Sequence, residues 1–129
     1  MRTAFEIVKA HYDANERRDL PGMIADIAAD CRWTEMAGFP CAGTYVGPEA
    51  VVENVFAALG QMFDGYAFKL ERLLDAGDDV VGIGDYSGTH KATGKSFQAR
   101  VVHVWHVDGD RISRFEQFTD TLRVAESMR

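Results

Sequence analysis

Two histidines stand in a strand-like run that is otherwise apolar, within VVHVWHVDGDRISRFEQFTD at residues 101–120. Because side chains alternate between the faces of a strand, His103 shares its face with apolar residues only. These residues are Phe97, Ala99, Val101, Trp105 and Val107. An imidazole there can donate a hydrogen bond to a substrate oxygen or shuttle a proton. The alternative is a structural histidine that is hydrogen-bonded to a backbone carbonyl or a neighbouring side chain. His106 lies on the opposite face and fits a surface or an interface better.

Two carboxylates are further candidates for chemistry. Glu35 shares a strand face with Trp33 in the run CRWTEM. A carboxylate in an apolar pocket has a raised pKa and can take a proton from carbon near neutral pH. The alternative is a glutamate at a cavity rim or one paired with arginine. Asp120, at the end of FEQFTD, could act as an acid or simply cap a helix that begins near Thr121.

Three helices are predicted before the main run of strands. The first covers residues 3–17, where TAFE has the pattern of a capping box. The second follows Asp19, a typical helix cap, and its apolar face runs from Ile24 to Ile27 and Ala28. The third covers residues 47–60, with a proline in its first turn and a glycine at its end.

Strands are predicted over much of the remaining chain. The first covers 31–36, and a loop rich in glycine and proline follows at 37–47. Further strands are expected near 66–74, 80–90, 97–107 and 112–118. Three glycines between positions 82 and 88 suggest bends or close backbone approach. Helices followed by an antiparallel meander predict an α+β domain.

Composition narrows the class of protein. The chain has 129 residues, which suits one domain over 1–129 that can bury a core without disulfide bonds or metal ions to stabilise it. Its net charge of −6 and scattered basic residues disfavour nucleic acid and anionic membranes as partners. The charged N-terminal stretch and the absence of a long apolar run predict a cytoplasmic protein. Cys31 and Cys41 are expected to be free thiols, and no set of residues has metal-ligand spacing.

Three segments, in their order, resemble the SnoaL-like and ketosteroid-isomerase-like families of the nuclear-transport-factor-two-like superfamily. They are VKAHYDANERRDLPGMIADIAADCRWTE, GTYVGPEAVVENVF and HVWHVDGDRISRFEQFTD. With the strands between them, they cover nearly the whole chain. The resemblance implies a cone-shaped curved antiparallel sheet, closed by N-terminal helices around an apolar pocket. It also implies a homodimer formed through the outer face of the sheet and a reaction that needs no cofactor.

The resemblance implies roles for four polar residues. Glu35 matches the general-base aspartate of the isomerases, with a side chain longer by one methylene. His103 matches their protonated aspartic acid, which donates a hydrogen bond to an oxyanion. His11 matches their oxyanion-hole tyrosine, a departure that counts against steroid isomerisation, although Tyr12 is adjacent. Asp120 matches an acid/base aspartate of the cyclases.

Aromatic residues could line a pocket for a flat ring, although ordinary core packing is the favoured explanation for most of them. The candidates are Tyr12, Trp33, Tyr45, Phe56, Phe68, Tyr86, Trp105 and Phe118. Trp33 and Trp105 are favoured, because each shares a strand face with a candidate polar residue. Epoxide hydrolysis is disfavoured, because Asp85 lacks the arginine two positions before it that this activity requires.

We therefore predict a cofactor-independent enzyme that removes a proton next to a carbonyl in a small apolar or aromatic compound. Isomerisation, cyclisation and dehydration all remain open. The alternatives are a binding module of the same fold without chemistry, and a protein that binds partners through its outer sheet face.

Overall fold

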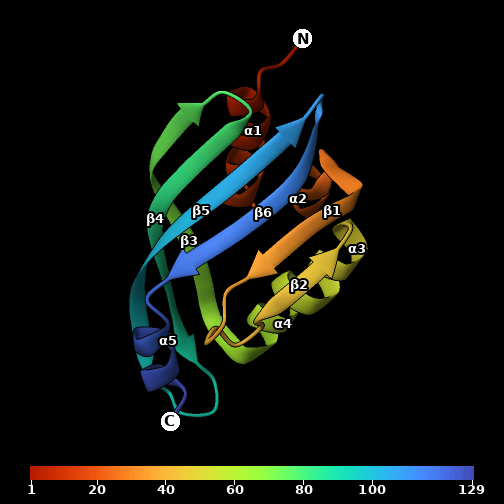
Figure 1. The fold of residues 1–129 in the computed structure, drawn as a ribbon. Helices are drawn as coiled ribbons and strands as arrows, with labels where there is room; N and C mark the ends of the chain where they lie inside the picture. Colours follow the sequence, from red (N-terminus) through yellow and green to blue (C-terminus); the bar gives the residue numbers. More distant parts are fainter.

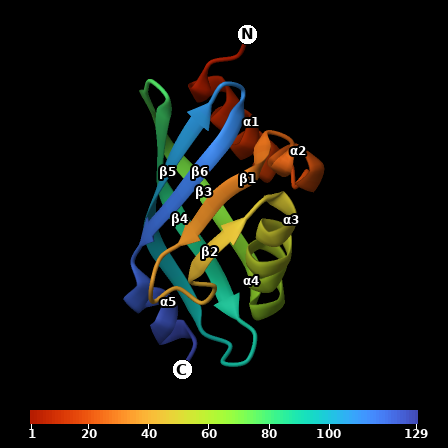
Figure 2. The same ribbon diagram turned by 45° about the vertical axis from the view of Figure 1, so that its right-hand side comes forward.

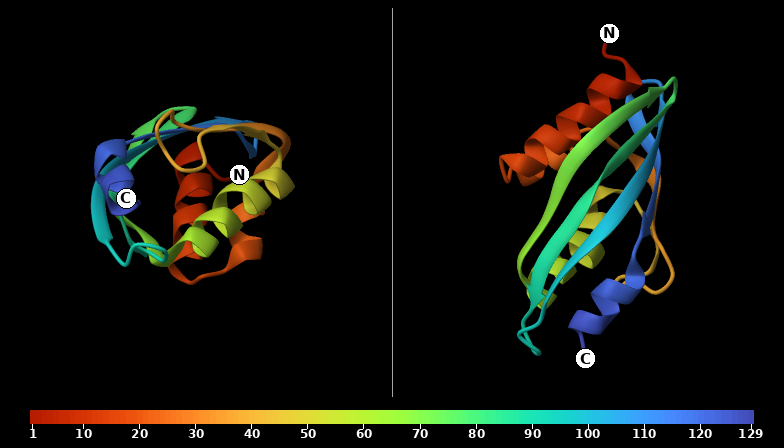
Figure 3. Two further views of the ribbon diagram at one scale, coloured as in Figure 1. Left: turned by 90° about the horizontal axis from the view of Figure 1, so that it is seen from below. Right: turned by 90° about the vertical axis from the view of Figure 1, so that its left-hand side faces the viewer.

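The computed structural model describes residues 1–129 and shows one curved sheet with helices against its concave side (Figure 1). The sheet has the strand order β2-β1-β6-β5-β4-β3 and is not closed into a barrel. Seen end-on, it forms a wall around the helices (Figure 3). The predicted α+β cone is therefore confirmed. No helix is both long and apolar enough to cross a bilayer.

The N-terminal helices form where the sequence predicts them, with one change. Helix α1 covers Ala4–Glu16, and the Thr3 and Glu6 side chains form the expected capping box. Helix α2 is short, Leu20–Ile24, and is capped by Asp19. The prediction that it extends through Ile27 and Ala28 was wrong. Those residues begin strand β1, Ile27–Glu35, where Ile27 is buried in the core.

A continuous helical stretch then connects the two edge strands. It consists of α3 (Pro48–Val51), the π-helical turn η1 (Val52–Phe56) and α4 (Ala57–Met62). It packs on β1 at one end and on β3 at the other, and so spans the open side of the cone (Figure 2). Strand β2, Gly43–Val46, lies in a segment predicted to be loop, where it pairs with β1.

The rest of the sheet is a meander of long strands. These are β3 (Phe63–Ala76), β4 (Asp79–His90), β5 (Ser96–Asp108) and β6 (Arg111–Thr119), followed by helix α5 (Thr121–Ser127). The expectation of a wholly antiparallel sheet was wrong at one position, because β1 pairs with β6 in parallel. This pairing places the end of β1 beside the end of β6.

The glycines of β4 allow close approach, as their spacing suggests. Gly82 lies directly opposite His103 in the sheet. A Cβ atom at Gly82 would collide with the hydroxyl of Tyr12, which reaches down from α1. A Cβ at Gly84 would collide with the Lys69 carbonyl, next to an irregularity in the pairing of β3 and β4. Gly82 therefore makes room for the side chain that α1 inserts into the cone.

Candidate active site

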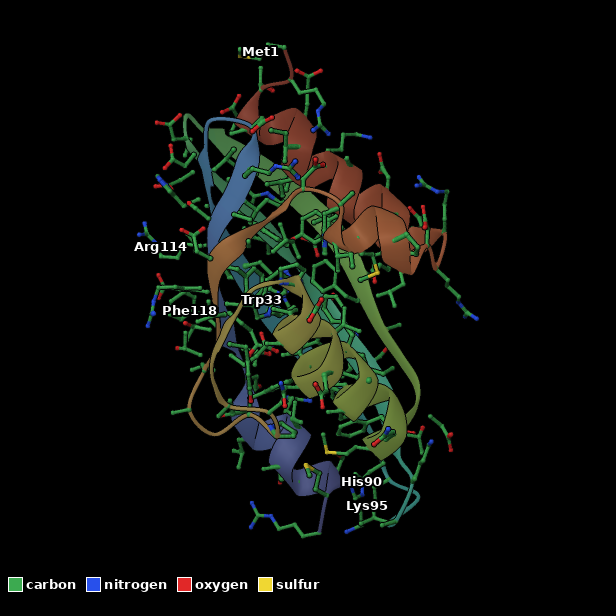
Figure 4. All side chains as sticks on the ribbon, turned by 90° about the vertical axis from the view of Figure 1, so that its right-hand side faces the viewer. Met1, Trp33, His90, Lys95, Arg114 and Phe118 are labelled. Atoms are coloured by element: carbon green, nitrogen blue, oxygen red, sulfur yellow. The ribbon has the colours of Figure 1, made fainter.

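A cavity of about 230 Å³ lies between the concave face of the sheet and helices α1 and α4. Its wall is largely aromatic and aliphatic, and it reaches the exposed Gly60 of α4 and the half-buried Asn15 of α1. Trp33, one of the predicted pocket residues, lies between strand β1 and the α3–α4 helical stretch in Figure 4. The polar side chains in the wall are Asn15, His11, Tyr12, Glu35, Tyr66, Tyr86 and His103.

Glu35 is buried at the end of β1 with its carboxylate held by three donors. Oε2 accepts a hydrogen bond from Nε1 of Trp33 at 3.2 Å. Oε1 accepts from Nε2 of Gln117 at 3.2 Å and from Sγ of Cys41 at 3.6 Å. Burial raises the pKa of Glu35 to about 7, and the bonds from Trp33 and Cys41 oppose that rise. A carboxylate with this pKa can exchange protons at neutral pH.

His103 lies in the middle of the cavity wall, with both ring nitrogens occupied by tyrosines. Nδ1 is 2.8 Å from the hydroxyl of Tyr12, and Nε2 is 2.7 Å from the hydroxyl of Tyr86. The ring packs between Phe68 and Phe115, with centroid distances of 4.7 and 4.9 Å. Burial lowers the pKa of His103 to about 3, so the imidazole is neutral at physiological pH.

Each tyrosine that contacts His103 has a second partner that can only donate. Nε1 of Trp105 donates to the Tyr12 hydroxyl at 2.8 Å. Nε2 of Gln117 donates to the Tyr86 hydroxyl at 2.8 Å. The orientation of the Gln117 amide is set by its other end, because Oε1 accepts from the backbone N–H of Met36 at 3.3 Å. Gln117 thus joins the tyrosine–histidine group to Glu35.

Sequence reasoning overlooked Gln117 and the polar role of Tyr86. Gln117 is 1% exposed and lies directly opposite His103 on β6. Its position two residues after the buried Phe115 was the available signal, since an amide on an apolar strand face needs partners. The part played by Tyr86 depends on the register of β4 against β5, which its residue type does not reveal.

His11 lines the cavity but cannot serve there as the donor that the resemblance implied. Its Nδ1 lies 2.8 Å from the carbonyl oxygen of Met23, so Nδ1 carries the hydrogen and donates it to that carbonyl. Burial lowers the pKa of His11 to about 4. The neutral ring therefore offers its Nε2 only as an acceptor. Tyr12, one residue on, takes the position facing His103 instead.

Three of the predicted site residues lie outside the cavity. Asp120 is exposed and caps α5, where it accepts a hydrogen bond from the backbone N–H of Arg123 and pairs with that side chain. The Tyr45 hydroxyl donates to the Cys41 carbonyl, and its ring does not line the cavity. Phe118 is 46% exposed and projects from the convex face (Figure 4). The alternation of β6 explains this, because Phe115 and Gln117 take the concave face.

The remaining predicted ring-binding residues do line the cavity. Trp33, Phe56 and Trp105 form one side of it, together with Phe115. Trp33 stacks on Phe115 with a centroid distance of 3.8 Å and meets Trp105 edge-on at 5.4 Å. Tyr12 lines the cavity near His103. These aromatic faces offer a surface on which a flat apolar ring can lie.

An α+β cone that carries several polar side chains inside an apolar cavity is the architecture of the nuclear-transport-factor-two-like class. The SnoaL-like domain profile matches residues 8–115, and the chain belongs to this family. No curated protein sequence matches the chain.

Solved structures show the same fold. A nuclear-transport-factor-two-like protein from Burkholderia thailandensis is 59% identical, with a TM-score of 0.99, and the match covers 100% of this chain and 99% of that one. Another, from Burkholderia pseudomallei, is 28% identical, with a TM-score of 0.87 and 98% of both chains covered. TerC, co-crystallised with polyporic acid, is 23% identical, with a TM-score of 0.86 and 97% of both chains covered.

Proposed function

We propose that the protein is a cofactor-independent enzyme that removes a proton from the carbon next to a carbonyl in a compact ring compound. The observation that carries this proposal is the placement of a buried Glu35 carboxylate in the same cavity as the Tyr12–His103–Tyr86 group. A base and a set of neutral hydrogen-bond donors in one apolar space are the two requirements for forming an enolate.

The step balances with these groups alone. The Glu35 carboxylate takes the proton, the carbon–hydrogen bond breaks, and its electrons form the carbon–carbon double bond of an enolate. The carbonyl oxygen gains the negative charge, which a tyrosine hydroxyl stabilises by donating a hydrogen bond. Glu35 then holds the proton and can return it to another carbon, which gives isomerisation. Attack by the enolate on a second carbonyl would give cyclisation, with the new alkoxide taking the proton from Glu35. Expulsion of a neighbouring hydroxyl by the enolate would give dehydration, with the same proton leaving as part of water.

The size of the cavity limits the substrate. A cavity of about 150 Å³ is known to bind benzene, and drug-sized ligands occupy pockets of about 300–1,000 Å³. The cavity here, at about 230 Å³, lies between these values. A single substituted ring or a fused pair of rings fits within this space. The co-crystallisation of TerC with polyporic acid supports a small-molecule ligand for this fold.

Deuterium exchange tests the proposal with a probe of suitable size. 1-Indanone, a two-ring ketone, is incubated with the protein in deuterated water, and NMR follows the loss of its hydrogens next to the carbonyl. We expect Glu35→Gln to slow the catalysed exchange by about 100-fold or more, the usual contribution of a general base. The matched control is Glu116→Gln, because Glu116 lies on the same strand as Gln117 but on the opposite face.

Two outcomes would contradict the enzyme. If the wild-type protein binds the ketone without accelerating exchange, the domain is a binding module of this fold. If Glu35→Gln exchanges hydrogens as fast as the wild type, the base is another group. Binding is measured separately by titration calorimetry, so that a failure of binding is not mistaken for a failure of chemistry.

We also propose that the convex face of the sheet forms a homodimer. Ile83, Val102 and Phe118 lie side by side across β4, β5 and β6, and Phe118 is 46% exposed. Such a row can pair with its own copy about a two-fold axis. Sedimentation should give a dimer mass for the wild type and a monomer for Phe118→Glu. A monomeric wild type would contradict this assembly.

A further inference from the structure

The hydrogen bonds around His103 form an unbranched chain of four contacts. Trp105 contacts Tyr12, Tyr12 contacts His103, His103 contacts Tyr86, and Tyr86 contacts Gln117. The two end groups can only donate, since an indole N–H and an amide N–H have no other role here. Each tyrosine oxygen therefore already accepts one hydrogen bond from an end of the chain.

The number of hydrogens exceeds the number of contacts. The indole, the amide, the two hydroxyls and the single N–H of a neutral imidazole supply one hydrogen each, which makes five. The chain has only four contacts to fill. If Nδ1 of His103 carries its hydrogen, it donates to Tyr12, and the Tyr12 hydroxyl hydrogen is left over. If Nε2 carries it, the Tyr86 hydroxyl hydrogen is left over instead.

We infer that His103 acts as a tautomeric positioning residue, which decides whether Tyr12 or Tyr86 donates the surplus hydrogen to an oxygen atom of the ligand. Both tyrosines and His103 line the same cavity, so either donor faces the bound molecule. Both nitrogens of the imidazole are occupied by the tyrosines, so His103 offers the ligand no hydrogen bond of its own. The two tyrosines are thus alternative donors for one ligand oxygen, on opposite sides of the ring.

This inference rests on the proposed function only for the identity of that oxygen as a carbonyl. The test measures ligand affinity, so its result does not depend on whether the protein catalyses the proposed reaction. The probes are 1-indanone and indane, which have the same ring skeleton with and without the oxygen. We expect the wild-type protein to bind 1-indanone about tenfold more tightly than indane, which corresponds to one hydrogen bond.

The single variants Tyr12→Phe and Tyr86→Phe should each retain most of this preference, because the other tyrosine still donates. The double variant should lose it. Tyr45→Phe is the matched control, since that hydroxyl bonds to the backbone outside the cavity. Loss of the preference in either single variant, or its retention in the double variant, would overturn the inference. Affinity for indane shows whether each variant still has a formed cavity.

Nitrogen-15 NMR of labelled histidine reads the tautomer directly. With 1-indanone bound, we expect the hydrogen of His103 on Nδ1 in Tyr86→Phe and on Nε2 in Tyr12→Phe. A hydrogen on the same nitrogen in both variants contradicts the inference. The wild-type protein gives a test that needs no variant, because two protonated ring nitrogens at pH 7 would also overturn it.

Discussion

The hydroxyl of Tyr86 lies 2.7 Å from Nε2 of His103 and 2.8 Å from Nε2 of Gln117. One phenol on β4 therefore contacts both an imidazole on β5 and an amide on β6. Since the same amide donates to Glu35, the base and the donor group are parts of one hydrogen-bonded assembly. A substitution in the donor group should therefore alter the hydrogen bonding of Glu35, and a substitution of Glu35 should alter that of the donor group.

Two tyrosine-to-phenylalanine changes should have different effects on stability. Tyr86→Phe leaves buried partners on His103 and Gln117 unsatisfied and should cost about 1–3 kcal/mol in the free energy of unfolding. The buried hydroxyl of Tyr66 makes no well-aligned hydrogen bond, although its ring packs beside that of Tyr86. Tyr66→Phe should therefore be neutral or stabilise the protein by up to about 1 kcal/mol. Urea denaturation measures both, and a large loss in Tyr66→Phe would show that its hydroxyl has a partner.

Gly82→Ala should disrupt the site from the strand next to His103. The new methyl group collides with the Tyr12 hydroxyl, so Tyr12 must move away from His103. We expect a loss of about 1–3 kcal/mol, typical of overpacking. Gly60→Ala is the control, because nothing lies near its Cβ position and alanine favours a helix by about 1 kcal/mol. Equal stability of the two variants would mean that Tyr12 is not held as described.

Stability should fall in acid because of the two buried histidines. Their pKa values are lowered to about 4 for His11 and about 3 for His103, so below about pH 6.5 the unfolded chain binds protons that the folded chain does not. Glu35 opposes this, because its pKa of about 7 makes the folded chain hold a proton that the unfolded chain releases above about pH 4.5.

The net difference between pH 6.5 and 4.5 is about one proton, two from the histidines less one from Glu35. Stability should therefore drop by about 1.4 kcal/mol per pH unit over this range. In Glu35→Gln the opposing group is absent, so the slope should be about twice as steep. Urea denaturation at several pH values gives both slopes, and parallel curves would show that Glu35 titrates normally.

The catalysed exchange of 1-indanone should rise with pH up to about 7 and then level off. The reason is that only ionised Glu35 acts as the base, and its pKa is about 7. His103 stays neutral throughout this range, so no second inflection is expected. An NMR pH profile of the exchange rate checks this, and a plateau already reached near pH 5 would contradict it.

Asp120→Ala separates the capping role from a catalytic one. Loss of the cap of α5 should cost about 0.5–2 kcal/mol of stability. The exchange rate at a temperature where the variant is folded should remain that of the wild type. A loss of exchange without a loss of stability would restore Asp120 as a participant in the chemistry.

The sequence predicted the parts of the site that depend on alternation within one strand. His103 with Trp105, and Glu35 with Trp33, face inward because every second residue of a strand shares a face. The same rule was not applied to β6, and that is why Phe118 was expected in the pocket.

The contacts between strands could not be predicted in the same way. They depend on register, and register is set by the whole packed sheet. The parallel pairing of β1 with β6, which brings Glu35 to Gln117, leaves no local signal in either segment. The role of Asp120 was ambiguous for another reason, since a carboxylate before a helix suits both a cap and an acid.

The parallel pairing of β1 and β6 also determines the order in which parts of the fold can form. The Glu35–Gln117 bond joins residues 82 positions apart, and the Tyr12–Trp105 bond spans 93 positions. During synthesis β1 can pair with β2 at once, but its other edge stays open until residues 111–119 have emerged. Contacts this distant in sequence make folding slow. The cavity is thus a late product of folding, and its ligand can stabilise only the completed chain.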